Sequence, residues 1–238
     1  SNYKVQGFTA EVALEDLAAL CRSKAVPLIY DLGGGVLVDL ERWGLPPEPV
    51  VSTSLQAGAD LVSFSGDKVL GGPQAGIIVG SRDYVEQVRQ NPLMRALRCD
   101  KLIYAALEAA LGLYRLPPEK LAQALPTLEM MGAGIATLET RAQKLVAQVS
   151  EADRCKLGIG VVESQAQAGS GAMPLAEIPS RAVAIRPVDL GLEQVARRLR
   201  REGVVGRVAQ GQLLLDMSTV RDAELMWIGR ALAKISRS

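Results

Sequence analysis

SFSGDKVLGGPQAGIIVG, residues 63–80, joins two apolar segments through a glycine-rich turn. We expect strands at residues 61–64 and 77–79, with Lys68 in the turn after the first strand. Ligands of α/β proteins bind outside the carboxyl ends of the strands, where such turns lie. Lys68 is therefore a candidate reactive amine, which needs partial desolvation to be neutral and nucleophilic. A solvated lysine in a surface turn fits the same residues.

An acidic strand end lies upstream of this turn. Residues 26–30 form a compact apolar run that ends at Asp31 and is followed by Gly33-Gly34-Gly35. A carboxylate at the end of a buried strand is costly without a partner. Beside a pyridoxal phosphate ring it would hold the ring nitrogen protonated, which makes the ring an electron sink. A turn-forming or helix-capping aspartate is the alternative.

Two polar residues precede Lys68 in the same turn. The hydroxyl of Ser65 could bind a phosphate, and the carboxylate of Asp67 could polarise the site or move protons, although both are also ordinary turn residues. Other nucleotide motifs are not matched: the chain has no GxxxxGK[ST], and the glycines at 33–35 lack the third glycine of GxGxxG.

Two arginines, Arg95 and Arg98, lie three residues apart in NPLMRALRCDK. At helical spacing they would project on one side and could grip an anion. A solvated basic face is the alternative. The later arginines at 197, 198, 200 and 201 surround the apolar face of an ordinary surface helix, so we predict no RNA site there.

Composition excludes several classes of function. The 238 residues are 48% hydrophobic and 22% charged, with a formal net charge of +1, as in an ordinary globular protein with a sizeable core. With three cysteines and no histidine, the chain cannot form a Cys/His zinc site or a Ser-His-Asp or Cys-His catalytic group, and we expect no metal. Because no apolar run approaches the length of a membrane span, we expect a cytoplasmic protein without a membrane partner.

The alternation of strands and helices predicts an α/β fold with a mainly parallel sheet covered on both faces. We expect helices capped by Thr9, Ser81 and Asp100. The apolar positions from Leu128 to Val149 recur every three or four residues and predict one long helix, either a connecting helix or a coiled-coil seam. The remainder reads as a small α+β domain with a hairpin turning at residues 210–211.

Several segments together resemble one family. They are SNYKVQGFT, DLGGGVLVDL, LVSFSGDKVLGGPQAGIIVG, NPLMRALRCDKLIYAALEAALGLYR, GSGAMPLAEIPS and VVGRVAQGQLLLDM. These segments closely resemble bacterial selenocysteine synthases, the L-seryl-tRNA(Sec) selenium transferases. The resemblance runs through essentially all of the chain, and its core, SGDKxLGGPQAGII, is long and specific.

The resemblance implies the fold of the aspartate-aminotransferase-like (fold type I) enzymes, which use pyridoxal 5′-phosphate. Residues 1–118 would then be the C-terminal part of the cofactor-binding large domain, 119–152 a connecting helix and 153–238 the small C-terminal domain. Lys68 would bind the cofactor covalently, Asp31 would pair with its pyridine nitrogen and Ser65 would lie near its phosphate.

The resemblance also implies a reaction and its partners. The α-amine of seryl-tRNA(Sec) would displace Lys68, whose freed amine would remove the α-proton. The serine hydroxyl would leave, and selenium from selenophosphate would add at the β-carbon. Asp67, Arg95 and Arg98 fall on positions associated with the active site, where the arginines suit a phosphate-bearing selenium donor. The family resemblance further implies a homo-oligomer with active sites at dimer interfaces.

The chain departs from the family in length, because family members are much longer. We expect a C-terminal fragment that lacks the N-terminal tRNA-contacting domain and the first half of the cofactor domain, and that is weak or inactive alone. Two other hypotheses stay open. One is a related pyridoxal phosphate lyase acting on a small amino acid or amino-sugar phosphate, and the other is a non-catalytic oligomerisation fragment.

Overall fold

The structure is a computed structural model that describes residues 7–169, 173 and 177–237. These residues form two compact units. The first contains residues 7–132, 167–169 and 173, and the second contains residues 133–166 and 177–237. Part of the segment GSGAMPLAEIPS, quoted above for the resemblance, lies outside the described residues. The predicted three-part division at residues 118 and 152 stays a prediction.

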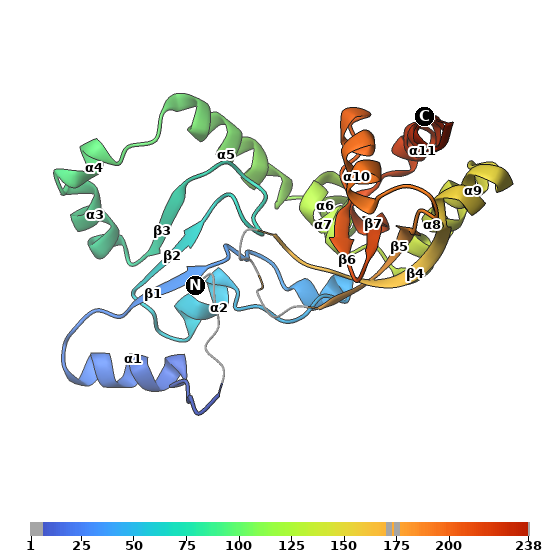
Figure 1. Cartoon of the computed structure of the whole chain (residues 1–238). Coiled ribbons are helices and arrows are strands. Elements are labelled where there is room, and N and C mark those ends of the chain that lie inside the picture. Colours follow the sequence, from blue (N-terminus) through green and yellow to red (C-terminus); the bar gives the residue numbers. More distant parts are fainter. Residues whose placement is uncertain (1–6, 170–172, 174–176, 238) are drawn as a thin grey trace. The chain divides into compact units, whose positions relative to one another are not determined.

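The first unit places a small sheet among helices (Figure 1). Its elements in chain order are α1 (Leu14–Ser23), β1 (Ile29–Gly33), the 3-10 helix η1 (Leu40–Trp43), α2 (Val51–Gln56), β2 (Leu61–Ser65), β3 (Gly76–Gly80), α3 (Arg82–Gln90), α4 (Leu93–Ala96), α5 (Lys101–Leu113), α6 (Pro118–Ala124) and α7 (Pro126–Met131). The predicted α/β class is confirmed, with the expected strands on either side of the Lys68 turn.

The sheet of the first unit is mixed. Its order is β1-β2-β3, with β1 parallel and β3 antiparallel to β2. The register aligns Asp31 with Ser63 and Ser63 with Ile78, so these three side chains lie on one face. A short connection explains the antiparallel pair, because ten residues, 66–75, are enough to reverse the chain but not to cross over.

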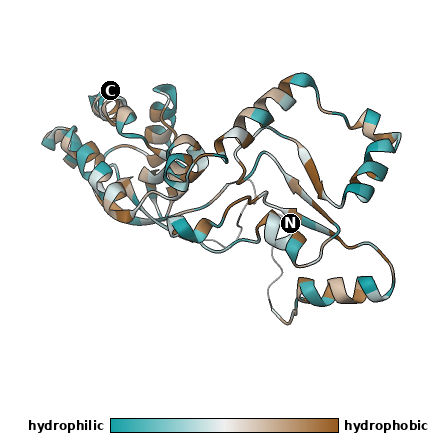
Figure 2. Cartoon of the chain, turned by 180° about the vertical axis from the view of Figure 1, so that it is seen from behind, coloured by the Kyte–Doolittle hydropathy of each residue, from teal (hydrophilic) through white to brown (hydrophobic). Residues whose placement is uncertain are grey.

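The two faces of this sheet differ in polarity. Alternate residues of the strands pack with α2 and α5 in one core cluster, whose buried members are Val51, Ala59, Val62, Phe64, Leu70 and Ala110. On the other face Ile29 and Ile78 are 63% and 43% exposed, so the expected cover on both faces is not found among the described residues. Figure 2 shows the hydrophobic strands beside the mostly hydrophilic α3.

Two of the three predicted helix starts are found. The carboxylate of Asp100 accepts hydrogen bonds from the amides of Leu102 (2.8 Å) and Ile103 (3.0 Å) and so caps α5. Ser81 is at the N-cap position of α3 as expected, but its side chain makes no capping hydrogen bond. The Thr9 cap is wrong, because α1 begins at Leu14 after an extended Ala13.

The second unit is a four-stranded antiparallel sheet of order β4-β5-β7-β6 with helices. Its elements are α8 (Ile135–Ala147), α9 (Glu151–Leu157), β4 (Ile159–Ala166), β5 (Ile178–Ile185), α10 (Leu192–Arg201), β6 (Arg207–Ala209), β7 (Gln212–Asp216), the 3-10 helices η2 (Met217–Thr219) and η3 (Asp222–Glu224), and α11 (Leu225–Arg237). The predicted hairpin is confirmed. Gln210 and Gly211 both have positive φ, 51° and 72°, as a type I′ turn requires.

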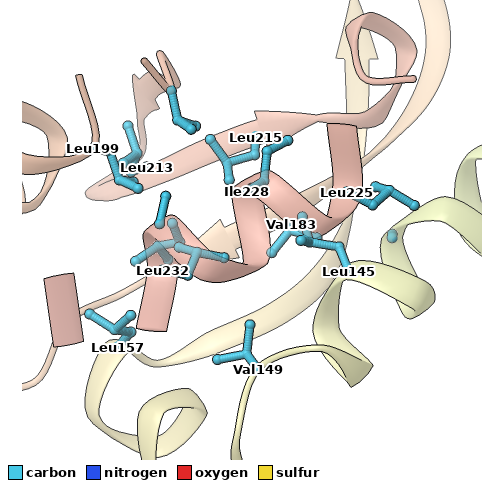
Figure 3. Close-up of a cluster of buried hydrophobic side chains, with 14 of the residues drawn as sticks. Leu145, Val149, Leu157, Val183, Leu199, Leu213, Leu215, Leu225, Ile228 and Leu232 are labelled. Atoms are coloured by element: carbon cyan, nitrogen blue, oxygen red, sulfur yellow. The ribbon is translucent and has the colours of Figure 1, made fainter. Parts of the chain in front are cut away.

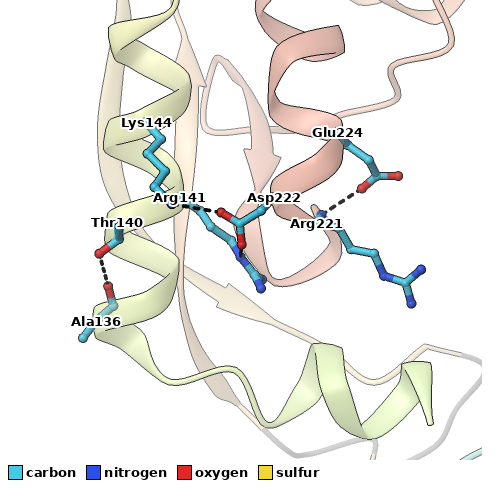
Figure 4. A network of polar contacts seen from close by, with 7 residues as sticks. All are labelled: Ala136, Thr140, Arg141, Lys144, Arg221, Asp222 and Glu224. Carbon is cyan, nitrogen blue, oxygen red and sulfur yellow. Dashed lines mark hydrogen bonds and ion pairs between the residues drawn. The ribbon is translucent and has the colours of Figure 1, made fainter. Parts of the chain in front are cut away.

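The core of the second unit lies between its sheet and helices α8, α10 and α11 (Figure 3). Val183 and Ile185 of β5 and Leu213 and Leu215 of β7 point into it. Asp222 fastens α8 to the start of α11, because its carboxylate accepts from Arg141 and Lys144, each at 3.2 Å (Figure 4). The hydrogen bond from Lys144 and then that from Arg141 hold the pKa of Asp222 below its usual value.

The periodic run from Leu128 to Val149 is not one helix. Helix α7 ends at Met131 and α8 begins at Ile135, with Gly132 and Gly134 between them. Gly134 is extended (φ −65°, ψ 147°) and leads into α8. Two glycines within three residues weaken a helix enough for the chain to break there although the apolar spacing continues.

Candidate functional site

Asp31 and Ser63 form the polar centre of the open face of the first sheet. Asp31 lies on β1 and is exposed, and Ser63 lies opposite it on β2 and is partly buried. The Ser63 hydroxyl donates a hydrogen bond to Oδ1 of Asp31 at 3.0 Å. Val62 and Phe64 alternate with Ser63 and point into the core, so the pleat fixes the face on which the serine lies.

The end of β1 turns immediately after Asp31. The strand register shifts between Asp31 and Gly33, as at a β-bulge, and Gly33 has φ 69°. Gly35 follows with φ 71°, and a Cβ there would overlap the carbonyl oxygen of Ser65 and lie 3.3 Å from the Phe64 ring. Glycine is therefore required at position 35 for the two strand ends to approach each other.

One backbone hydrogen bond ties the Lys68 turn to the strand end that carries Asp31. The amide of Val69 donates to the carbonyl of Gly34 at 3.2 Å. Within the turn, the amide of Gly72 donates to the carbonyl of Gly66 at 2.8 Å. Lys68 is partly buried, between the buried Gly66 and Val69. The structure thus brings the predicted lysine turn and the predicted acidic strand end together.

Tyr114, just after the end of α5, supports this turn from the core side. Its hydroxyl donates to the carbonyl of Leu70 at 2.9 Å. Burial raises the pKa of Tyr114 to about 12, so the hydroxyl keeps its proton at physiological pH. On β1, the pKa of Tyr30 is also raised, first by burial and then by the negative charges of Glu11 and Glu48.

The other two turn residues differ in exposure. Ser65 is the last residue of β2, lies two positions after Ser63 on the same face, and is partly buried. Asp67 is exposed in the turn. Both are near Lys68 in the chain, and their predicted contacts with phosphate and protons stay predictions.

Arg95 and Arg98 do not lie at the Lys68 end of the sheet. Because β3 is antiparallel to β2, its last residue, Gly80, pairs with the first residue of β2, Leu61. Helices α3 and α4 follow β3 at that end, away from the turn after β2 (Figure 1). Arg95 is exposed on α4, and Arg98 is exposed beyond its end at Ala96, so the expected helical spacing of the pair is not found.

The sequence reasoning missed Ser63. The signal was present, because Ser63 and Ser65 alternate with Val62 and Phe64 in a predicted strand, and alternation places both serines on one face. The hydrogen-bond partner of Ser63 could not be predicted from the sequence, since the parallel register that sets Ser63 opposite Asp31 depends on the fold.

Lys68 and Asp31 are the residue types that pyridoxal phosphate requires at two of its atoms. A lysine amine is what the aldehyde carbon requires, and a carboxylate fixed on an adjacent strand end is what a protonated pyridine nitrogen requires. The link from Val69 to Gly34 supports this fit, because it joins the segments that supply the two groups.

The described residues contain neither a metal-binding cluster nor a membrane-spanning helix. Among residues 7–169, 173 and 177–237, no three His, Cys, Asp or Glu side chains are grouped so that they could hold a metal ion. No helix in the same ranges is both long and apolar enough to cross a membrane.

Comparison with solved structures supports the fold. The chain aligns over its whole length with 56% of a D-glucosaminate-6-phosphate ammonia-lyase, with a TM-score of 0.58 and 20% sequence identity. This likeness confirms the α/β fold and nothing beyond the fold.

Comparison of sequences is more specific. An L-seryl-tRNA(Sec) selenium transferase of Methylocella silvestris is 46% identical over 93% of this chain and 48% of its own length. That of Haemophilus influenzae is 43% identical over 95% of this chain and 50% of its own length. The chain therefore spans about half the length of these curated relatives. The family model described as "SelA: L-seryl-tRNA selenium transferase" matches residues 1–221. With the SGDK turn and the Asp31 strand end in place, the chain belongs to the L-seryl-tRNA selenium transferase family.

Proposed function

We propose that the protein carrying this chain converts seryl-tRNA(Sec) to selenocysteinyl-tRNA(Sec), with pyridoxal 5′-phosphate as cofactor and selenophosphate as selenium donor. The proposal concerns the whole protein, because the chain spans about half the length of its curated relatives. One observation carries it above the others. The Lys68 turn and the Asp31 strand end are hydrogen-bonded to each other within a family match that covers residues 1–221.

Lys68 has two tasks in this proposal. The bound cofactor supplies an electron sink that stabilises negative charge at the substrate α-carbon. The Lys68 amine would hold the cofactor through its aldehyde carbon and, when free, would take the α-proton of the seryl group. The place of Lys68 supports this assignment, because its turn is hydrogen-bonded to the strand end that carries Asp31.

Asp31 and Ser65 hold the cofactor at its two polar ends. The carboxylate of Asp31 would accept a hydrogen bond from the protonated pyridine nitrogen, and the hydroxyl of Ser65 would donate one to the phosphate. Their common face of the sheet supports this division, since the register sets Asp31 opposite Ser63 and Ser65 lies two residues further along β2 on the same face. Asp67, exposed beside Lys68, is proposed to pass protons between the amine and solvent.

Arg95 and Arg98 are proposed to bind the anionic selenium donor across a subunit boundary. Within one chain they lie at the end of the sheet opposite Lys68, so they can serve a site only if a second copy brings them to it. We propose a homo-oligomer in which the arginines of one copy approach the Lys68 turn of another. Exposed apolar side chains on the neighbouring surface, Leu97 (71%) and Leu102 (72%), support such a contact.

Selenium transfer to tRNA tests the function directly. The complete gene product, supplied with pyridoxal phosphate, seryl-tRNA(Sec) and labelled selenophosphate, is expected to place label on the tRNA. Lys68→Ala is expected to abolish both this transfer and the visible absorbance of the lysine-bound cofactor. Transfer that persists in Lys68→Ala would contradict the assignment.

The same assay separates the other hypotheses. A lyase would bind no seryl-tRNA(Sec) and would release ammonia from an amino acid or amino-sugar phosphate. An oligomerisation fragment would show no visible cofactor band in either the chain or the complete gene product.

Mixing two inactive variants tests the shared site. Lys68→Ala alone and the double variant Arg95→Ala with Arg98→Ala are each expected to lose at least ~100-fold in transfer activity, the scale on which removing a catalytic or clamping group acts. Co-expressed, they are expected to recover activity, because mixed pairs contain one site with both its lysine and its arginines. No recovery in verified mixed oligomers would contradict the proposal that the arginines of one copy serve the Lys68 site of another.

A further inference from the structure

We infer that Ser63 is a positioning residue for Asp31: its hydroxyl fixes the carboxylate so that one oxygen is presented to the cofactor's ring nitrogen. The inference deepens the proposed function and rests on it. Ser63 is assigned no contact with the cofactor itself, so its effect passes through Asp31.

The geometry defines which oxygen is held. Ser63 Oγ donates to Asp31 Oδ1 at 3.0 Å, between paired residues of parallel strands. The bond engages Oδ1, which leaves Oδ2 as the oxygen for the ring nitrogen. An aspartate carboxylate has a broad torsional preference about its last bond, so a second contact is needed to fix its plane. Ser63 supplies that contact.

The backbone next to Asp31 does little to fix the direction of its carboxylate. The bulge between Asp31 and Gly33 interrupts the ladder directly after Asp31, and Gly33 has a positive φ of 69°. Bulges re-aim the side chains beside them, and a glycine adds no side chain to hold the new direction. The neighbouring strand β2 is regular from Leu61 to Ser65, so Ser63 is attached to the firmer of the two strands.

Solvent exposure separates a positioning role from a structural one. The Ser63–Asp31 bond lies on an exposed part of the sheet, where water competes for both groups, so it contributes little to the stability of the unliganded protein. A bound cofactor would cover the carboxylate and exclude water, and the same bond would then be stronger. Loss of the hydroxyl should weaken cofactor binding far more than it weakens folding.

The test compares Ser63→Ala and Ser63→Thr in the complete gene product titrated with pyridoxal phosphate. Ser63→Ala is expected to weaken cofactor affinity roughly tenfold, as for loss of one hydrogen bond to a charged group, and to reduce the visible circular dichroism that reports ring orientation. Ser63→Thr keeps a hydroxyl and is expected to restore both. The thermal unfolding of the unliganded protein should be the same in all three.

A matched control and the opposing outcomes complete the test. Ser23→Ala removes a serine hydroxyl that donates to the Leu20 carbonyl of its own helix, and it should change neither readout. The inference about Ser63 would be overturned, and the proposed function left standing, if the wild type shows the visible cofactor band and Ser63→Ala binds pyridoxal phosphate with the same affinity and the same circular dichroism. If Ser63→Ala destabilises the unliganded protein as much as it weakens cofactor binding, Ser63 has a structural role and the inference is overturned as well. Absence of any cofactor band in the wild type would overturn the proposed function and this inference with it.

Discussion

Gly35 shows how strictly one residue can control the approach of two strand ends. Its φ of 71° and the overlap that any Cβ would make with the Ser65 carbonyl both exclude a side chain. We predict that Gly35→Ala lowers the free energy of unfolding by about 2 kcal/mol or more, because strain and a backbone clash add. It should also weaken cofactor binding, since Ser65 lies at the contact.

Gly34 provides the control for this prediction. Its backbone carbonyl accepts the bond from Val69, but an added Cβ would meet its nearest atom, Val36 Cγ2, at 4.0 Å. Gly34→Ala should therefore stay within about 1 kcal/mol of the wild type. Equal denaturant midpoints for the two variants would contradict the role assigned to Gly35.

Asp216 is a carboxylate of the second unit that accepts hydrogen bonds from three serine hydroxyls. The hydroxyls of Ser180 (2.5 Å), Ser164 (2.7 Å) and Ser218 (2.7 Å) donate to it, which joins β4, β5 and β7 to the turn after β7. Burial alone would raise the pKa of Asp216, but these hydrogen bonds outweigh burial and hold the pKa below its ordinary value. The charged form is therefore the one that the fold favours.

This direction fixes how stability depends on pH. Because the folded-state pKa of Asp216 is lowered, its stabilisation is complete above the unfolded value of about 3.9 and is lost as the pH falls toward the folded value. We predict that Asp216→Ala costs about 2 kcal/mol or more at neutral pH, since three hydroxyls lose their acceptor. Denaturant unfolding should also show a shallower decline below pH ~4 in the variant than in the wild type.

Asp189→Ala is the matched control for Asp216→Ala, since Asp189 is an exposed carboxylate of the same unit. It should leave the free energy of unfolding within about 0.5 kcal/mol of the wild type at neutral pH. Identical pH profiles for wild type and Asp216→Ala would show that the serine cluster does not favour the charged form.

At the scale of elements, Tyr114 connects the C-terminal end of α5 to the Lys68 turn. Tyr114→Phe removes the hydrogen bond to Leu70 and leaves a buried carbonyl unpaired, for an expected cost of about 1–2 kcal/mol. Tyr104→Phe, on the 57% exposed side chain of the same helix, should cost less than about 0.5 kcal/mol. Urea unfolding of both variants measures the difference, and equal costs would show that the Tyr114 bond does not brace the turn.

The pKa of Tyr114 gives this element its own pH dependence. The folded-state pKa is raised to about 12 from its ordinary value of 10.0, so the unfolded chain ionises first. The associated stability is present below pH ~10 and is lost as the pH rises toward 12. Tyr114→Phe should remove that part of the alkaline decline.

Elements with local signals could be predicted from the sequence. The Asp100 cap, the hairpin at residues 210–211 and the strands around Lys68 follow from neighbouring residues. The predicted long helix failed because periodicity carried no information on the glycines at 132 and 134. The Ser63–Asp31 bond and the Asp216 cluster join residues 32 to 52 positions apart, so they depend on strand register that no local pattern contains.

At the scale of the whole molecule, the first unit leaves apolar surface uncovered among its described residues. Leu97 and Leu102 are exposed near the start of α5, and Ile29 is exposed on the open face of the sheet. We predict that the purified chain self-associates at micromolar concentration, because surfaces of this kind bury themselves against a partner. Sedimentation velocity would measure the effect, and a monodisperse monomer would contradict it.

Charge substitutions locate the responsible surface. Leu97→Glu with Leu102→Glu is expected to shift the dissociation constant at least ~10-fold toward the monomer, because buried charges oppose association. Ser52→Glu with Gln87→Glu adds the same two charges at exposed polar positions and should have little effect. Equal shifts for the two pairs would indicate general charge repulsion.

The parallel pairing of β1 with β2 has a consequence for the order of folding. β2 and β3 are joined by the ten residues 66–75, whereas Asp31 and Ser63 are 32 residues apart and must be brought together across α2. Closing the longer loop costs more chain entropy, and contacts of high sequence separation form late. The lysine turn should therefore be in place before the carboxylate strand docks beside it. Capture of the cofactor by both groups would then report the last step in the assembly of this unit.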